Sequence, residues 1–210
     1  MKMKTEKQGK PTGGGKFNAI PADTYQGRCI GVVDMGLQAG YEGKAVSQIA
    51  LVFEIYDVLD GDGMPRTVTT WGITKSTNPK ANLYKFLSNW LPEGVSTYEY
   101  EDWDEKQGKE ATLIGLEVDT SLIPGSPAMV TMGLNKKGKV VLASLTAPHK
   151  SMTMPEQVHD SYHFDLDEDS PSSFAAIPEW LAKRVNRTGQ PPVQDVFEPK
   201  KDTIAQDVPF

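Results

Sequence analysis

Cysteine is almost absent from this 210-residue chain, which contains Cys29 alone. A single cysteine excludes an internal disulfide framework and a zinc site built from several cysteines, and it suits a reducing cytosol. No stretch reaches the roughly eighteen consecutive apolar residues that a membrane-spanning helix requires. Residues 1–16 are basic and no apolar run follows them, so the sequence predicts no secretion signal.

Motifs for catalysis or cofactor binding are also missing. The sequence contains no GxxxxGK followed by Ser or Thr, no GxGxxG and no HExxH. The three histidines, His149, His159 and His163, lie near or in the C-terminal part rather than in the predicted folded body. His159 and His163 are four residues apart, so a metal site is conceivable, but a polar linker is the favoured interpretation. Residues 165–169 resemble the start of a calcium loop, yet they lack its glycine and its closing glutamate. We therefore expect no enzymatic activity, no metal and no cofactor.

Charge is divided unevenly along the chain, whose 22 Lys and Arg against 28 Asp and Glu give a net charge of −6. Residues 93–119 hold 9 acids and 2 lysines, and residues 151–210 hold 11 acids and 5 bases. The remaining residues, 1–92 and 120–150, hold 15 bases and 8 acids. The acidic total would normally argue against binding to nucleic acid, but it conceals a basic body.

Hydrophobic periodicity predicts a mainly β fold. Apolar residues alternate over three segments, change to helical spacing after Pro79, and alternate again over two more segments. The predicted strands are 24–36, 45–58, 64–76, 124–135 and 139–148, with a helix between Asn78 and Gly94 and an acidic insertion at 93–124. Five strands with a helix between the third and fourth are typical of an OB-fold barrel, which binds oligonucleotides. Another small β-barrel, or a sandwich with an inserted helix, remains the alternative.

Composition suggests four regions. Residues 1–16 are predicted to be a flexible basic arm, and residues 17–150 an OB-fold domain that binds nucleic acid. Residues 151–189 are predicted to be an acidic linker with one short helix at 178–189. Residues 190–210, which contain four prolines and no periodicity, are predicted to be a disordered tail.

Binding of nucleic acid requires cations for phosphates and aromatic faces for bases. Trp71 and Lys75 have the same side-chain parity on the third predicted strand, so they could form a stacking platform beside a phosphate contact. The alternative is that Trp71 belongs to the core, as its alternation with Ile73 suggests. Trp90 and Cys29 are predicted to be core residues. The residues predicted to contact nucleic acid are Lys16, Phe17, Arg28, Lys44, Arg66, Trp71, Lys75, Lys80, Lys136, Lys137 and Lys139.

The last residues form a distinctive ending, Asp207-Val208-Pro209-Phe210. A tail of this kind suits docking to another protein: the phenyl ring fills a pocket, the terminal carboxylate meets a cation, and nearby acids steer the encounter. The ending resembles the C-terminal tip of bacterial single-stranded DNA-binding proteins, in which an acidic run ends in Ile-Pro-Phe.

A second resemblance covers roughly residues 17–187. The blocks PADTYQGRCIGVVDMG, ALVFEIYD, TKSTNPKANLYKFLSNWL and LIPGSPAMVTMGLNKKGKVVLASLTAP, followed by FDLDEDSPSSFAAIPEWLAKRV, are similar to small phage-encoded single-stranded DNA-binding proteins of the OB type. The resemblance implies a non-catalytic protein of phage DNA replication or recombination in the cytoplasm of the bacterial host. It would bind single-stranded DNA and recruit a polymerase, helicase, nuclease or recombinase through its C-terminus, with no membrane association and possible homo-oligomerisation. The alternatives are a protein-interaction adaptor that does not bind DNA and a structural virion domain.

Overall fold

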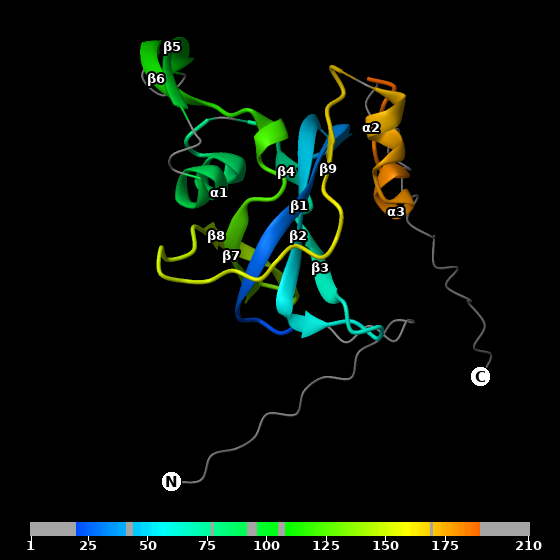
Figure 1. Cartoon of the computed structure of the whole chain (residues 1–210). Helices are drawn as coiled ribbons and strands as arrows, with labels where there is room; N and C mark the ends of the chain where they lie inside the picture. The colour runs from blue at the N-terminus through cyan, green and yellow to red at the C-terminus, as the bar shows by residue number, and fades with distance from the viewer. Residues whose placement is uncertain are drawn as a thin grey trace, which may run out of the picture.

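A computed structural model describes residues 20–40, 44–76, 78–91, 96–104, 108–168 and 170–189. In this part of the chain the protein is mainly β, with one sheet of seven strands, one separate hairpin and a few short helices (Figure 1). The strands are β1 Thr24–Ala39, β2 Ala45–Leu59, β3 Pro65–Thr69, β4 Ile73–Thr74, β5 Ser96–Asp104, β6 Lys109–Glu117, β7 Pro127–Leu134, β8 Val140–Thr146 and β9 Tyr162–Phe164. The helices are α1 Asn82–Trp90, α2 Pro171–Ala175 and α3 Glu179–Ala182, and a 3-10 turn, η2, spans Thr120–Leu122.

The large sheet has the strand order β3-β2-β1-β7-β8, with β4 added to β2 and β9 added to β1. All of these pairings are antiparallel except that of β1 with β9. This confirms the predicted mainly β fold, although the element order also contains the short β4 before α1, the β5–β6 hairpin after it, and β9 after β8. The described strands do not close into a barrel, because β3 and β8 lie at opposite ends of the order without pairing.

The third predicted strand is interrupted at Thr70. The backbone N–H of Leu51 donates to Thr70 Oγ1 at 2.8 Å, and that hydroxyl donates back to the Leu51 carbonyl oxygen at 3.2 Å. The side chain of Thr70 thus takes one place in the ladder. Gly72 then adopts a φ of 69°, which turns the chain before β4. The turn aims the intervening Trp71 away from the strand, so strict alternation does not continue through residues 64–76.

Glycines let β1 bend around the core. Its register against β2 shifts between Cys29 and Gly31 and again between Asp34 and Gly36, and Gly36 has a φ of 68°. A Cβ at Gly31 would overlap the ring of Tyr162, so only glycine leaves room for that ring. Glycines inside a strand commonly occur at such bulges, where the strand bends.

One hydrophobic core lies between the inner face of the sheet and α1. Trp90 is buried there, with its ring centroid 5.2 Å from that of Phe53, and its indole N–H donates to the Pro127 carbonyl oxygen at 2.7 Å. Cys29 is also fully buried in this core, and burial raises the pKa of its thiol to about 12. Both residues therefore belong to the core, as predicted.

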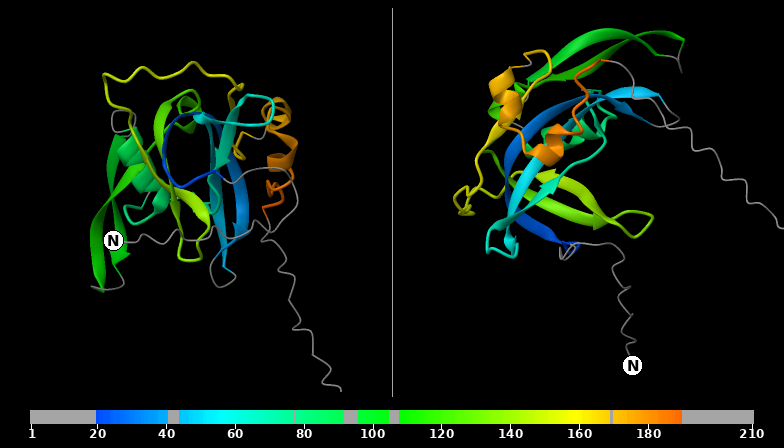
Figure 2. Two further views of the ribbon diagram at one scale, coloured as in Figure 1. Left: turned by 90° about the horizontal axis from the view of Figure 1, so that it is seen from below. Right: turned by 90° about the vertical axis from the view of Figure 1, so that its right-hand side faces the viewer.

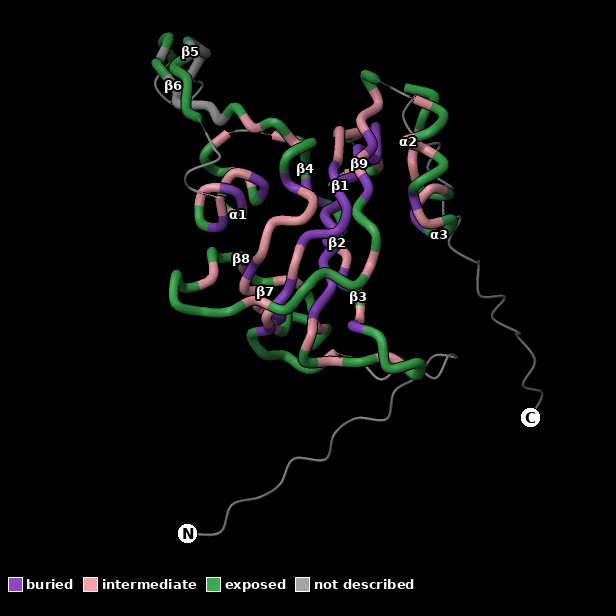
Figure 3. Tube along the Cα trace, in the orientation of Figure 1, coloured by how far each residue is buried: buried purple, intermediate pink, exposed green. Residues whose placement is uncertain are grey.

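A second core covers the outer face of β1 and β2. Residues 162–168 and 170–185, predicted to lie in an acidic linker, instead pack there: β9 pairs with β1, and Phe164, Ile177 and Leu181 are buried against the sheet. The predicted helix 178–189 is also shorter, because α3 contains only Glu179–Ala182. Burial is consequently concentrated on the central strands, which are covered on both faces (Figure 3).

The predicted acidic insertion contains a β-hairpin. Strands β5 and β6 pair along their whole length and form a sheet of their own that projects from the body above α1 (Figure 1). In the described part of the chain, no helix is both long and apolar enough to cross a membrane.

Candidate nucleic-acid interface

Trp71 is exposed at the interruption between β3 and β4. Its side chain belongs to neither core, and 48% of the residue's surface is accessible. The indole of Trp180 meets it edge-on, with ring centroids 6.0 Å apart. The guanidinium carbon of Arg184 lies over its ring, 4.5 Å from the centroid. Exposed aromatic side chains and arginine are among the groups that contact the bases of single strands.

Two hollows flank Trp71. One, of about 390 Å³, lies between the β3–β4 connection and β8, where Val140 and Leu142 line it. The other, of about 440 Å³, lies between the end of β1, the start of β2 and Arg184. Because Trp71 and Gly72 line both, the tryptophan stands between the two hollows.

The β1–β2 and β7–β8 hairpins extend towards the same side of the molecule (Figure 2, right). Lys44 is exposed at the turn of the first hairpin, where its carbonyl oxygen accepts from the Gly40 N–H at 2.8 Å. Three exposed lysines, Lys136, Lys137 and Lys139, occupy the turn of the second hairpin. Within the described residues, no carboxylate lies within ion-pair distance of these lysines.

The turn at Lys136–Lys139 is held in shape by Asn135. Its side-chain oxygen accepts from the backbone N–H groups of Lys137 and Lys139 at 2.9 and 3.0 Å. The backbone is thus fixed while the ammonium groups are left in solvent, which suits contacts with phosphates.

Of two further predicted cations, Lys80 lies near the interruption that carries Trp71, whereas Arg66 lies towards the other end of β3, where its charge acts on Asp60. Lys80 is exposed ahead of α1 and lines a third hollow that also includes Gly72. Arg66 is half-buried on β3, opposite Ile55.

Arg28 serves the fold instead. Its guanidinium donates to the carbonyl oxygens of Gly125 at 2.6 Å and Pro155 at 3.1 Å, and its Nε donates to Tyr56 Oη at 3.4 Å. These contacts fasten the segments around residues 125 and 155 to β1. The prediction that Arg28 is a nucleic-acid contact is therefore not supported by its geometry.

Lys75 is likewise engaged within the protein. Its ammonium group is 2.5 Å from the buried carboxylate of Asp34 and 3.9 Å from that of Asp165. Partial burial alone would lower the pKa of Lys75, but the hydrogen bond and charge of Asp34 outweigh it, so the pKa is raised. Lys75 also lines a different hollow from Trp71, and the two do not form the predicted common platform.

The remaining predicted site residues lie outside the described part of the chain. They are Lys16 and Phe17 near the N-terminus and Asp207, Val208, Pro209 and Phe210 at the C-terminus.

Trp180 and Arg184 were not among the residues predicted to contact nucleic acid, because the segment that contains them was predicted to be a short helix in an acidic linker. The structure leaves 46% of Trp180 exposed. The signal in the sequence was a tryptophan and an arginine four positions apart, the spacing of one helix face, although α3 ends at Ala182 and both side chains contact Trp71.

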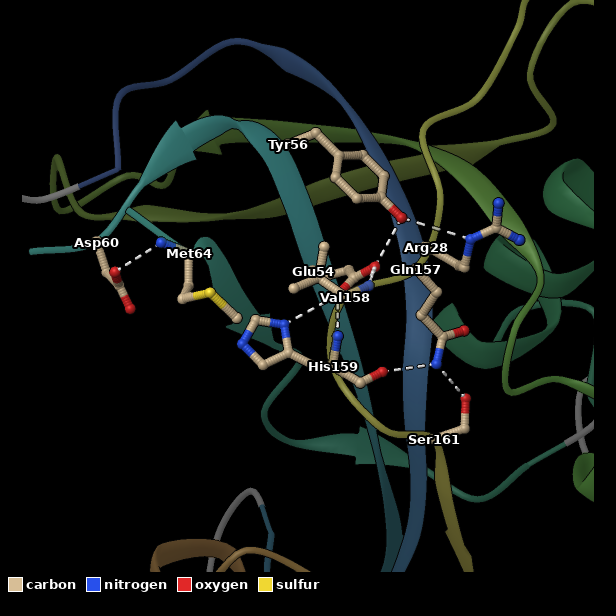
Figure 4. A network of polar contacts seen from close by, with 9 residues as sticks. All are labelled: Arg28, Glu54, Tyr56, Asp60, Met64, Gln157, Val158, His159 and Ser161. Atoms are coloured by element: carbon tan, nitrogen blue, oxygen red, sulfur yellow. Dashed lines mark hydrogen bonds and ion pairs between the residues drawn. The ribbon is translucent and has the colours of Figure 1, made fainter. Parts of the chain in front are cut away.

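The buried carboxylate of Glu54 on β2 is the centre of a network of polar contacts (Figure 4). Glu54 accepts hydrogen bonds from Tyr56 Oη at 2.6 Å, from the backbone N–H groups of Val158 and His159 at 3.1 and 2.9 Å, and shares a 2.9 Å contact with His159 Nδ1. Burial alone would raise the pKa of Glu54, but these hydrogen bonds lower it. Burial and the contact with Glu54 raise the pKa of Tyr56 to about 12. The network holds residues 157–161 against β2.

Replacing Glu54 with glutamine should make the free energy of unfolding less dependent on pH in the acid range. A carboxylate whose pKa is lowered on folding stabilises the protein above its unfolded pKa, about 4.3, and this contribution disappears as pH falls through the folded pKa. We expect Glu54→Gln to lower the free energy of unfolding by about 1–3 kcal/mol at pH 7, with the difference shrinking below about pH 4. Urea unfolding at pH 7 and at a pH below about 4 measures this difference in the free energy of unfolding. The exposed neighbour Glu156→Gln is the control, and a difference that stays constant with pH contradicts the prediction.

No group of three or more His, Cys, Asp or Glu residues in the described chain is placed to hold a metal ion. Comparison of the chain with protein-family models, curated proteins and solved structures finds no match.

Proposed function

We propose that this protein binds single-stranded DNA, coating it with little sequence preference through phosphate contacts and base stacking. The observation that carries the proposal is the exposed Trp71, which stands between two hollows, beside Trp180 and under Arg184. Base–aromatic stacking tolerates any sequence, because every base has a π-face. The exposed lysines on the two hairpins supply the cations that a phosphate backbone needs.

An OB-fold is the architecture we propose for the body. Strands β1, β2, β3, β7 and β8, with α1 between the third and fourth of them, correspond in number and order to a partly open five-stranded Greek-key barrel. In an OB-fold the loop between the first two strands and the loop between the last two bind oligonucleotides. Here these loops contain Lys44 and Lys136–Lys139, which supports both proposals together.

The biological role that we propose is in phage DNA replication or recombination, in the cytoplasm of a bacterial host. The acidic C-terminal residues would occupy the surface between the lysine-bearing hairpin turns weakly when DNA is absent and leave it when DNA binds. Phe210 would then recruit a polymerase, helicase, nuclease or recombinase. The proposed role requires no catalysis, cofactor or membrane contact, and it allows homo-oligomerisation.

Titration of the protein with oligo-dT at increasing salt tests the proposal. Each phosphate contact on a single strand contributes about −0.7 to the slope of log affinity against log salt concentration. If Lys44 and the three lysines of the β7–β8 turn each contact one phosphate, the slope should be about −3. Absence of binding at low salt, or a slope near zero, would overturn the proposal. Deleting residues 201–210 should preserve or tighten DNA binding while abolishing capture of partner proteins.

A protein-interaction adaptor without DNA binding is the second candidate. The β5–β6 hairpin favours it, because the hairpin projects from the body, Glu99, Glu101 and Glu110 are exposed on it, and an isolated two-stranded hairpin gains stability from a partner. The same titration separates the candidates: an adaptor binds its protein partner and leaves oligo-dT unbound at every salt concentration.

A further inference from the structure

The hollow between Trp71 and the end of β1 has features that stacking and phosphate contacts do not require. Its volume of about 440 Å³ falls within the range of sites for small organic ligands, about 300–1,000 Å³. Met35 and Ala50 give it apolar wall, Trp71 gives it an aromatic face, and Gln38 and Gln48 give it two amides. A strand held only by its phosphates and by stacking would need neither amide.

The amide of Gln38 is fixed in orientation. Its Nε2 donates to the Met35 carbonyl oxygen at 2.7 Å and to the Arg184 carbonyl oxygen at 3.0 Å. Both partners are acceptors, so the nitrogen must face them and both of its hydrogens are used. The side-chain oxygen of Gln38 is therefore left as an acceptor in a set position. The same contacts hold the Arg184 backbone beside the hollow.

The amide of Gln48 is available to a ligand. Gln48 lies on β2, where its backbone is in register with Gly36 on one side and Thr74 on the other. Its side chain is half-buried, and no other described residue makes a hydrogen bond with its amide. It therefore offers both donors and an acceptor. The hydroxyl of Thr70, also at this hollow, is already committed to Leu51.

We propose that this hollow binds one nucleobase of the single strand, which stacks on Trp71 and presents its Watson–Crick edge to Gln38 and Gln48. The ring contributes the sequence-tolerant part of binding, and the two amides contribute hydrogen bonds to the edge of an unstacked base. This inference rests on the proposed function and adds a subsite to it. The site accepts either a pyrimidine or a purine, and the protein contacts the Watson–Crick edge of this one base only.

Blocking the base edge tests the subsite without changing phosphates or stacking surface. Two oligonucleotides of equal length are compared, one of thymidine and one of N3-methylthymidine, which has the same ring but no edge donor at N3. The wild-type protein should bind the thymidine strand about 2- to 10-fold more tightly, the effect of one net hydrogen bond. Gln48→Leu, which keeps the side-chain volume, should reduce this preference by at least half. Gln48→Glu, which keeps acceptor oxygens at constant shape but removes the amide donors, should retain this preference while weakening the binding of both oligonucleotides. Gln26→Leu, at the opposite end of β1, is the matched control and should leave the preference unchanged.

The outcomes separate the subsite from the proposed function. If oligo-dT does not bind at all, the function and the subsite fall together. If oligo-dT binds well but the wild-type protein does not distinguish the two oligonucleotides, the subsite is overturned while DNA binding stands. An undiminished preference in Gln48→Leu, with its unfolding midpoint unchanged, also overturns it.

Discussion

Replacing Trp71 with alanine should weaken binding of single-stranded DNA by about 5- to 150-fold. The range corresponds to the roughly 1–3 kcal/mol per base that aromatic stacking contributes. Trp71 supplies an exposed face between two hollows, and its loss also removes the ring that holds the Arg184 guanidinium in place. Fluorescence anisotropy with labelled oligo-dT measures the change without relying on tryptophan emission.

The stability of the fold should be nearly unchanged by this replacement, because Trp71 belongs to neither hydrophobic core. The unfolding midpoint of Trp71→Ala should therefore stay close to that of the wild-type protein, and Trp71→Phe should retain most of the DNA affinity. Equal affinities of the alanine variant and the wild type would show that the strand binds elsewhere.

Replacing Phe164 with alanine should lower the free energy of unfolding by about 3–5 kcal/mol, the usual cost of truncating a buried phenylalanine. Phe164 is 1% exposed, and its ring centroid lies 5.3 Å from that of Phe174. Urea unfolding at neutral pH gives the value. The exposed Val158→Ala in the same part of the chain is the control and should change stability by less than about 0.5 kcal/mol.

A truncation extends the same prediction. A chain that ends after residue 150 leaves Val33, Met35 and Val52 without their cover, so it should be unfolded or aggregated. A chain that ends after residue 189 keeps both cores and should unfold like the full protein. A stable, soluble fragment 1–150 would show that the second core is dispensable.

The sequence is sufficient to predict the strands and the helix whose hydrophobic pattern is local. Alternation locates β1, β2, β7 and β8 to within a few residues, and Pro79 and Pro92 bracket α1. The interruption at Thr70 escaped this approach, because it depends on a side-chain bond to Leu51, 19 residues away. Closure of the barrel was also beyond reach, since it depends on whether two strands distant in sequence pair.

The second core could not be found from periodicity. Tyr162 and Phe164 have strand spacing and Ile177 and Leu181 have helical spacing, but each pattern is too short to show that the segment packs on the sheet, and the acids between them suggested a linker. The candidate site was limited in the same way. Whether a cation is exposed or bonded within the protein depends on partners distant in sequence, as for Arg28 with Pro155. Composition therefore identified the group of cations but could not show which of them are free to contact DNA.

The parallel pairing of β9 with β1 also sets an order of events during synthesis. Tyr162 pairs with Gly31, so about 130 residues are translated between the two. At about 5–20 residues per second, this takes roughly 7–26 s. Throughout that time the outer face of β1, with Ile30 and Val33, has no intramolecular cover. The nascent chain thus exposes an apolar, aggregation-prone surface long after its first hairpin can form. The yield of the protein in the cell should therefore depend on chaperones that shield this surface until the segment containing β9 has been translated.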